Sequence, residues 1–305
     1  MSETAPRPAW RDRAFVGMQY LLPQHGLSRL VKHATRSVRP SWKNFLIRAF
    51  LRRFDVDMSE AAEPDPLAYP SFNAFFTREL RAGARPLPAD PAAIVSPVDG
   101  TVSEAGAIDG DRLLQAKGHD YSLNALLAGD AELTRTFRNG LFATLYLAPY
   151  NYHRIHMPVA GRLLQTTYVP GRLFSVNAVT AAQVPGLFAR NERVVCSFDT
   201  ALGRMVLVLV GALFVGSMAT VWAEDLAAPA DGQPAQLAPP SHPVVLPCGA
   251  EMGRFNMGST VILLLPSGAA RWHASLRAGA RVRMGEAIGE SVARAATTIL
   301  EHARS

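Results

Sequence analysis

Apolar residues follow a helical spacing in two stretches near the start of the chain. In the first stretch they recur at intervals of three and four positions: Leu27, Leu30, Val31, Ala34 and Val38. The second stretch runs from Lys43 to Phe54 and includes three phenylalanines. Such spacing places the apolar side chains on one face of a helix. We therefore predict two amphipathic helices in this part of the chain.

Beyond residue 65 the pattern changes to short apolar runs bounded by glycines and prolines, which predicts β-strands. The runs cover residues 94–95, 101–102, 141–147, 193–198, 206–210 and 261–265. Ser71 and Ser122 each precede a short helical pattern as its N-cap, and Gly129 ends the second pattern. The predicted fold class is α+β, with a β-rich domain over residues 65–305 and N-terminal basic amphipathic helices in residues 1–64.

Two later stretches interrupt this pattern. Residues 205–223 carry no charge over nineteen positions, which is long enough to span a membrane. The stretch is rich in valine and is broken by Gly211, Gly216 and Ser217, so we predict two buried strands joined at a glycine turn instead. Residues 224–247 contain six prolines and are predicted to form a long loop.

Positive charge is concentrated in the N-terminal segment. Residues 1–54 carry eleven Lys and Arg against two acids, a net +9, whereas the whole chain carries +6, so the rest carries −3. Basic amphipathic helices suit an anionic membrane, because their apolar side chains enter the acyl boundary while Arg and Lys meet phosphates. The alternative is that these apolar faces pack on the protein's own core. No nucleic-acid recognition motif accompanies the charge, so we expect no nucleic-acid partner.

Composition and cysteine usage limit the class of protein. With 49% hydrophobic and 18% charged residues, the chain is neither disordered nor a coiled coil. Cys196 and Cys248 lie far apart, and the first residues contain no apolar signal-peptide core. We expect free thiols in a reducing, cytosolic compartment.

Three stretches contain residue types that carry chemistry. Asp99 lies in SPVDGT at a Pro/Gly turn, where an aspartate is most often only a turn residue. His153 and His156 lie three positions apart in YHRIHMP, with no third ligand nearby, so we expect no metal site. Ser259 follows Gly258 in FNMGST.

An aspartate, a histidine and a serine form the set that activates a hydroxyl. The serine attacks, the histidine takes its proton, and the aspartate orients the imidazole. Such sets are defined by geometry and not by order in the chain. On residue types alone, Ser259 is therefore a turn residue, a protease-like nucleophile, or the place where the chain cuts itself.

Eight segments resemble the phosphatidylserine decarboxylase family, in the same order from about residue 65 to about residue 290. They are FFTRELRAGARP, SPVDGT, QAKGHDYSLNALL, YHRIHMP, VPGRLFSVN, NERVVCSFDT, VGSMATVW and EMGRFNMGST. The family usually has leucine where this chain has Met257, an apolar side chain of similar size. The first 54 residues resemble the family only in their basic, amphipathic character. The resemblance is to the bacterial type, which is self-processing and pyruvoyl-dependent.

The resemblance implies that the chain cuts its own bond between Gly258 and Ser259. The Ser259 hydroxyl would attack the Gly258 carbonyl and turn the amide into an ester. Elimination and loss of ammonia would then leave a pyruvoyl group, the cofactor, at the new N-terminus. Gly258 suits this step because it has no Cβ to obstruct attack and tolerates strained backbone angles. The resemblance assigns the base to His156, oriented by Asp99.

The reaction implied by the resemblance is decarboxylation of phosphatidylserine to phosphatidylethanolamine. The pyruvoyl ketone would form a Schiff base with the substrate amine and accept the electrons released as carbon dioxide leaves. His153 is expected to return a proton to the carbanion. We expect a peripheral enzyme on the cytoplasmic face of the cell membrane, with its two cleaved chains as partners and a homodimer as a further expectation. Anionic phosphatidylserine also accounts for the basic helices.

Two alternatives belong to other functional classes. A serine hydrolase with an intact Asp99/His156/Ser259 triad would remain one polypeptide and would be labelled by a serine-directed phosphonate. A non-catalytic membrane-binding module would use SPVDGT and the Gly258 turn only as structural elements. It would show neither a protein-bound carbonyl nor turnover.

Overall fold

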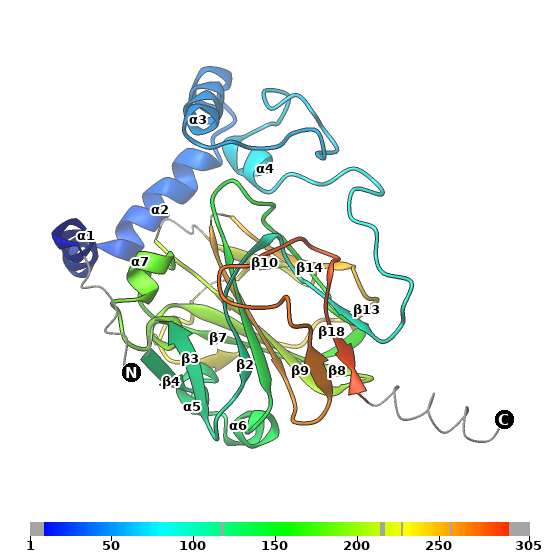
Figure 1. Cartoon of the computed structure of the whole chain (residues 1–305). Helices are drawn as coiled ribbons and strands as arrows, with labels where there is room; N and C mark the ends of the chain where they lie inside the picture. The colour runs from blue at the N-terminus through cyan, green and yellow to red at the C-terminus, as the bar shows by residue number, and fades with distance from the viewer. Residues whose placement is uncertain (1–8, 117–118, 214–216, 227, 257, 293–305) are drawn as a thin grey trace.

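The chain begins with three helices: α1 (Trp10–Leu21), α2 (Gln24–Thr35) and α3 (Pro40–Arg53). The computed structural model describes residues 9–116, 119–213, 217–226, 228–256 and 258–292. The three helices lie on one side of a strand-rich body (Figure 1). Helices α2 and α3 confirm the two predicted amphipathic helices. The sequence of α1, WRDRAFVGMQYL, has no clear apolar stripe, which is why it was not predicted as a separate helix.

A nine-stranded antiparallel sheet forms the centre of the body. Its order is β12–β7–β8–β9–β15–β5–β2–β17, and β13 also pairs with β7. In chain order the strands are β2 (Gly100–Ala107), β5 (Leu141–Leu147), β7 (Gly161–Val169), β8 (Arg193–Thr200), β9 (Gly203–Val210), β12 (Ala235–Gln236), β13 (Val245–Leu246), β15 (Ser259–Leu265) and β17 (Arg281–Val282).

Smaller sheets and short helices surround this centre. One sheet contains β6 (Arg154–His156), β10 (Met218–Thr220), β11 (Ala223–Leu226) and β14 (Glu251–Phe255). Another contains β1 (Ala93–Val95), β16 (Ala270–Trp272) and β18 (Ala287–Ser291), and a hairpin contains β3 (Arg112–Ala116) and β4 (His119–Ser122). The short helices are α4 (Phe72–Phe76), α5 (Leu123–Leu126), α6 (Ala131–Phe137), α7 (Ala178–Ala181) and α8 (Leu187–Arg190). This arrangement confirms the predicted α+β class.

The predicted local signals reappear in these elements. The six apolar runs lie in β1, β2, β5, β8, β9 and β15. The Ser71 hydroxyl accepts a hydrogen bond from the Ala74 N–H at the start of α4, and Ser122 caps α5 in the same way. Residues 205–223 contain most of β9 and the whole of β10, as predicted, although Gly216 lies outside the described residues. No helix in the described ranges is both long and apolar enough to cross a bilayer.

The prediction of a long loop over residues 224–247 is wrong in part. The segment includes the end of β11 and two short strands, β12 and β13, both of which pair with β7. Strand β7 has nine residues and would otherwise expose an unpaired edge. Prolines lie between the short strands, where no ladder hydrogen bond is required. The segment therefore covers a sheet edge in two pieces.

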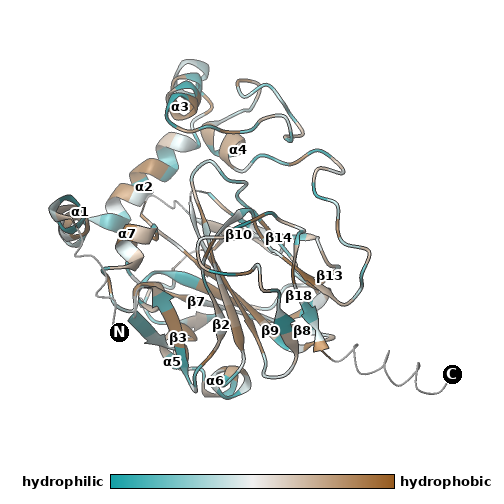
Figure 2. Cartoon of the chain, in the orientation of Figure 1, coloured by the Kyte–Doolittle hydropathy of each residue, from teal (hydrophilic) through white to brown (hydrophobic). Residues whose placement is uncertain are grey.

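Two hydrophobic clusters hold the molecule together. The larger one is built around the central sheet, whose strands carry most of the apolar colour in Figure 2. The smaller one joins α3 to the segment that follows: Ile47, Tyr69, Phe72, Phe75 and Phe76. Phe50 packs edge-on against Phe72, with ring centroids 5.3 Å apart, whereas Phe45 is 58% exposed. One face of α3 therefore packs on the core, and the phenylalanines of this helix do not share one face.

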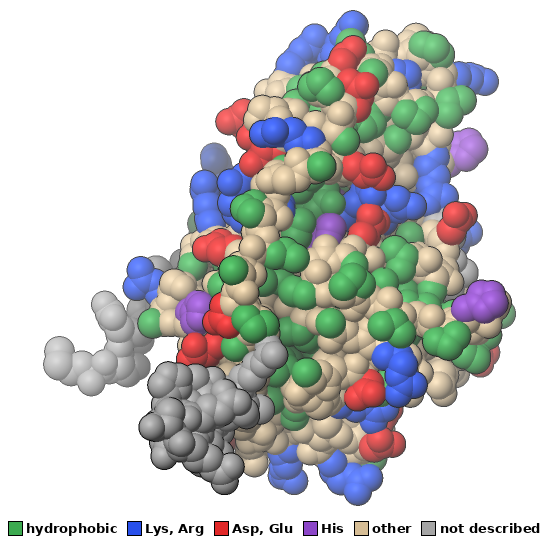
Figure 3. Space-filling view, turned by 90° about the vertical axis from the view of Figure 1, so that its right-hand side faces the viewer, with side chains coloured by type: hydrophobic (Ala, Val, Ile, Leu, Met, Phe, Trp, Pro, Cys, Tyr) green, Lys and Arg blue, Asp and Glu red, His purple; other side chains and the backbone are tan. Residues whose placement is uncertain are grey.

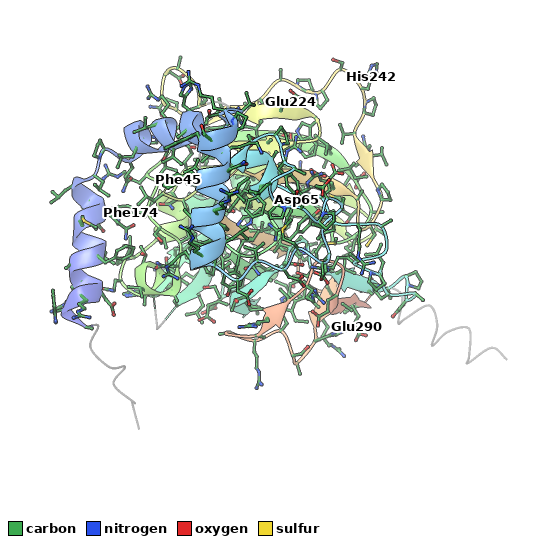
Figure 4. All side chains as sticks on the ribbon, turned by 90° about the horizontal axis from the view of Figure 1, so that it is seen from above. Phe45, Asp65, Phe174, Glu224, His242 and Glu290 are labelled. Atoms are coloured by element: carbon green, nitrogen blue, oxygen red, sulfur yellow. The ribbon has the colours of Figure 1, made fainter. Side chains whose placement is uncertain are left out.

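Two buried glutamines connect α1 and α2 to residues 173–180. The Gln19 side-chain oxygen Oε1 accepts from the Ser175 N–H at 2.8 Å, and its side-chain nitrogen Nε2 donates to the Thr180 hydroxyl at 3.3 Å. The Gln24 side-chain oxygen Oε1 accepts from the Leu173 N–H at 2.9 Å. Figure 4 shows Phe174 on the side of the body that faces α1. The N-terminal helices are thus fixed to the body by buried polar contacts.

Candidate active site

The Gly258–Ser259 bond lies at the junction of two sheets. Strand β14 ends at Phe255 and β15 begins at Ser259; Met257 lies outside the described residues. Asn256 is buried, and its backbone and side-chain oxygens accept from the Asn73 amide at 3.1 and 3.2 Å. Its own amide nitrogen donates to the Ser217 hydroxyl at 2.6 Å. Contacts from distant parts of the chain therefore hold the residues just before the bond.

The Ser259 hydroxyl is buried and free of hydrogen bonds. Ser259 is 0% exposed, and its Oγ has no hydrogen-bond partner among the described residues. In the sheet it is paired with Leu147 of β5. Buried hydroxyls are nearly always hydrogen-bonded, and exceptions often have a catalytic role. Among the described residues, no donor or acceptor therefore competes for this oxygen.

Gly258 lies beside His153. A Cβ placed on Gly258 would lie 3.5 Å from the Leu147 carbonyl oxygen and 3.7 Å from His153 Nε2, both ordinary contact distances. The backbone of Gly258 is outside the left-handed region, so the strained angles considered from the sequence are not observed. The structure therefore shows neither backbone strain nor a close contact that requires glycine at this position.

The His153 ring is neutral and presents a free nitrogen. Its Nδ1 lies 2.8 Å from the Asn151 carbonyl oxygen, so Nδ1 carries the proton and donates it. Nε2 therefore has the lone pair, and it is buried without a partner among the described residues. The ring packs against Phe76 in a tilted arrangement, with centroids 4.0 Å apart. Burial, assisted by the charge of Arg78, lowers the pKa of His153 to about 3.

The His156 ring is held by two other groups. Its Nδ1 donates to the Gly249 carbonyl oxygen at 2.7 Å, and its Nε2 accepts from the Tyr152 hydroxyl at 3.0 Å. Burial lowers the pKa of His156 below its ordinary value. His156 is therefore a neutral ring whose lone pair is occupied by a tyrosine.

Asp99 is neutralised by an arginine. Its carboxylate lies 2.6 Å from Arg85 Nη2 and accepts from the Met284 N–H at 2.8 Å. Within the described residues, no hydrogen bond connects Asp99, His156 and Ser259 to one another. Sequence reasoning identified these three residues but missed their actual partners, Tyr152 and Arg85. Both lie inside the quoted motifs, yet residue type alone does not show a tertiary contact.

A small apolar cavity opens beside the Gly258–Ser259 bond. Its volume is about 160 Å³, and it is lined by Phe76, Tyr146, Leu147, Pro149, Ser175, Val176, Ala212, Leu213 and Gly258. Ser175 is the residue whose N–H is held by Gln19, so one wall of the cavity is attached to α1.

Comparison with known families agrees with this geometry. The family model for phosphatidylserine decarboxylase matches residues 72–290. The chain belongs to the phosphatidylserine decarboxylase family. A second family model, described as PSD, matches residues 14–55, so the N-terminal segment resembles known sequences more closely than its character alone indicated.

Individual relatives are similar over nearly their whole length. A phosphatidylserine decarboxylase proenzyme of Marinobacter nauticus is 52% identical over 281 residues, which covers 92% of this chain and 98% of the relative. The proenzymes of Acidovorax ebreus and Methylococcus capsulatus are 54% and 51% identical, over 91% of this chain and 97% and 96% of the relatives. The predicted family and enzyme class are confirmed. Both alternatives, a serine hydrolase and a non-catalytic module, are disfavoured.

The buried neutral His153 predicts that acid destabilises the protein. Between pH 6.5 and about 3 the unfolded chain binds a proton on His153 that the folded chain does not. Unfolding free energy should therefore fall as pH falls through this window, by about 2 kcal/mol at pH 5 from this group. Urea denaturation at pH 7 and pH 5 should show that His153→Gln loses about 2 kcal/mol less than wild type.

The exposed His242 provides the control for this measurement. His242→Gln should retain the full loss of stability between the two pH values. An identical pH dependence in wild type and His153→Gln would show that His153 is not held neutral in the folded chain.

Proposed function

We propose that the chain cuts itself between Gly258 and Ser259, and that Ser259 becomes a pyruvoyl group used to convert phosphatidylserine into phosphatidylethanolamine. One observation carries the proposal: a fully buried serine hydroxyl without a partner adjoins a glycine carbonyl in a member of this family. The relatives are named proenzymes, which is the form expected of a precursor that is later processed.

Self-cleavage needs a nucleophile, a base and an open carbonyl. In the proposal, the Ser259 oxygen attacks the Gly258 carbonyl carbon as the amide bond breaks, and an ester forms. Elimination across Ser259 releases the Gly258 carboxylate, and one water then displaces ammonia. The products are a chain of residues 1–258 and a chain of residues 259–305 with a blocked N-terminus.

The proposed base is His156, supported by Asp99. For this role, His156 Nε2 must exchange the Tyr152 hydroxyl for that of Ser259, because it has only one lone pair to offer. The negative charge of Asp99 favours the protonated ring, which is what a base forms when it accepts a proton. His153 is nearer to Gly258, so an experiment has to separate the two histidines.

Decarboxylation uses the same small cavity. The pyruvoyl group supplies an electron-withdrawing carbonyl that accepts the electron pair as carbon dioxide leaves. The apolar residues around Gly258 exclude water from the substrate carboxylate. His153 Nε2 faces this space with a lone pair, and we assign it a relay role: it first accepts the proton that the net reaction draws from solvent and then returns it to the substrate carbon.

The membrane partner is proposed from exposed apolar side chains. Of the fifteen large hydrophobic side chains exposed in the described residues, nine lie between positions 10 and 45: Trp10, Phe15, Met18, Tyr20, Leu21, Leu30, Val38, Trp42 and Phe45. Most of the positive charge of residues 1–54 lies on the same helices. We propose that this surface attaches the enzyme peripherally to the cytoplasmic face of an anionic membrane, where phosphatidylserine is available. The homodimer remains a prediction.

Ser259→Ala should give one uncut and inactive chain, because no hydroxyl remains to attack Gly258. Intact-mass spectrometry of the denatured protein measures this directly. Wild type should give two chains, with the shorter one blocked at its N-terminus. Two fragments from Ser259→Ala, or a single chain from active wild type, would contradict self-cleavage.

The two histidine variants should fail at different steps. His156→Ala should remain uncut, because the proposed base is missing. His153→Gln should be cut but should lose turnover of dissolved short-chain phosphatidylserine by about 100-fold or more, the scale of a lost general acid. A cut His156→Ala together with an uncut His153→Gln would reverse the two roles.

The exposed apolar side chains should control attachment to vesicles. A triple variant with Leu30, Val38 and Phe45 each changed to Ser should bind anionic vesicles at least about tenfold more weakly, since each buried side chain contributes about 1.5–3 kcal/mol. Flotation at low salt measures this binding. Turnover of dissolved short-chain phosphatidylserine should not change.

The matched control changes Leu164, Val221 and Val245 to Ser. These side chains are also exposed but lie outside the N-terminal helices. Vesicle binding by the control should equal that of wild type. Equal binding by both triple variants would place the membrane contact elsewhere.

A further inference from the structure

Arg78 is a buried guanidinium that has no carboxylate partner in the described part of the chain. It is 5% exposed, and its Nε has no hydrogen-bond partner among the described residues. Its Nη2 makes one long contact of 3.4 Å to the Tyr150 carbonyl oxygen, and its Cζ lies 5.9 Å from the centre of the Phe75 ring. Burying an unpaired charge costs folding free energy, so the position of Arg78 requires an explanation.

Three other buried or largely buried arginines show how this chain normally satisfies such a charge. Arg85 contacts Glu60 at 2.9 Å and Asp99 at 2.6 Å. Arg154 contacts Glu79 and Glu251 at 2.9 and 2.6 Å. Arg193 donates to four backbone carbonyl oxygens: those of Ala125, Leu126, Ala189 and Asn191. Of these four arginines, Arg78 alone lacks a matched set of acceptors in the described structure.

Arg78 lines a polar cavity of about 370 Å³. The lining also includes Asn151 and Tyr152, which lie beside His153, and the charge of Arg78 reaches that ring. Side chains of both signs gather around a histidine on the face shown in Figure 3. Asp99 in this lining already has Arg85 as its partner, so it does not neutralise Arg78.

We propose that Arg78 binds the phosphate of the phospholipid headgroup, an inference that rests on the proposed function. The planar guanidinium presents several N–H groups in a fixed geometry that matches phosphate oxygens. The position of Arg78, close to His153 but outside the lining of the small apolar cavity, separates a charge-binding site from the reacting carbon.

A phosphate fits this site better than the substrate carboxylate does. The carboxylate loses its charge as carbon dioxide leaves, so an arginine bound to it would stabilise the starting state and slow the reaction. The phosphodiester keeps its charge throughout, and binding it affects ground state and transition state alike. Loss of Arg78 should therefore raise KM more than it lowers kcat.

The first experiment measures turnover of dihexanoyl phosphatidylserine by Arg78→Gln, Arg78→Lys and the exposed control Arg81→Gln. All three should cut themselves, as judged by intact mass. Arg78→Gln should lose about 10- to 100-fold in kcat/KM, the scale of a charged hydrogen bond, mainly through KM. Arg78→Lys should recover part of the loss because it keeps the charge, and Arg81→Gln should equal wild type. The melting temperature of Arg78→Gln should not fall, whereas a structural role would lower it together with activity.

The second experiment does not depend on turnover. Inorganic phosphate should raise the melting temperature of full-length Ser259→Ala protein relative to chloride at equal ionic strength. The shift should disappear in the Ser259→Ala/Arg78→Gln double variant. Failure of self-cleavage in wild type would therefore refute the proposed function but would leave the anion site untouched. The phosphate-dependent thermal shift tests the anion site independently.

A phosphate-free O-acylserine, an ester of the serine hydroxyl that keeps its amine and carboxylate free, distinguishes the remaining outcomes. Its turnover should be the same in wild type and Arg78→Gln. An equal loss on this ester and on the phospholipid, or no loss on the phospholipid, would overturn the assignment. A phosphate-dependent thermal shift without any change in phospholipid KM would also overturn it and would identify free phosphate as the ligand.

Discussion

The position of Ser259 depends on one strand that is paired on both sides. Strand β15 is bonded to β5 along its whole length and to β9 along most of it, and all seven of its residues are buried. Ser259 is the first residue of this strand, where it pairs with Leu147 of β5 and precedes the residues that are paired on both sides. The segment before it is held by Asn73 and by the Phe255 N–H, which donates to the His153 carbonyl oxygen. The chain is thus fixed on both sides of the Gly258–Ser259 bond, with His153 beside it.

Burial of unpaired polar groups at this site lowers the stability of the folded protein. Ser259 Oγ, His153 Nε2 and Arg78 Nε are all buried without a partner in the described structure. In most of the protein, buried polar atoms are matched, as the four carbonyls around Arg193 illustrate. Unmatched groups that gather in one region are typical of a site where stability has been exchanged for reactivity.

The sequence predicted those elements whose signals are local. The run from Leu141 to Leu147 became β5 with the same ends, because a strand buried on both faces is mostly apolar. Strand β7 was missed, since GRLLQTTYV mixes polar and apolar residues along a strand that is only partly buried. The motifs supplied Asp99, His153, His156 and Ser259. They could not show that the Tyr152 hydroxyl hydrogen-bonds to His156 Nε2, because that contact depends on how a loop folds back on itself.

The glutamines at positions 19 and 24 tie the N-terminal helices to the body of the protein. Helices joined to the body only by a linker could be exchanged for another segment without affecting it. Here the Gln19 amide is 0% exposed and completes the backbone bonding of Ser175, a residue in the wall of the reaction cavity. A transplanted segment without these glutamines would remove the acceptors of the Leu173 and Ser175 N–H groups. The helices and the catalytic body are therefore constrained to evolve as one unit.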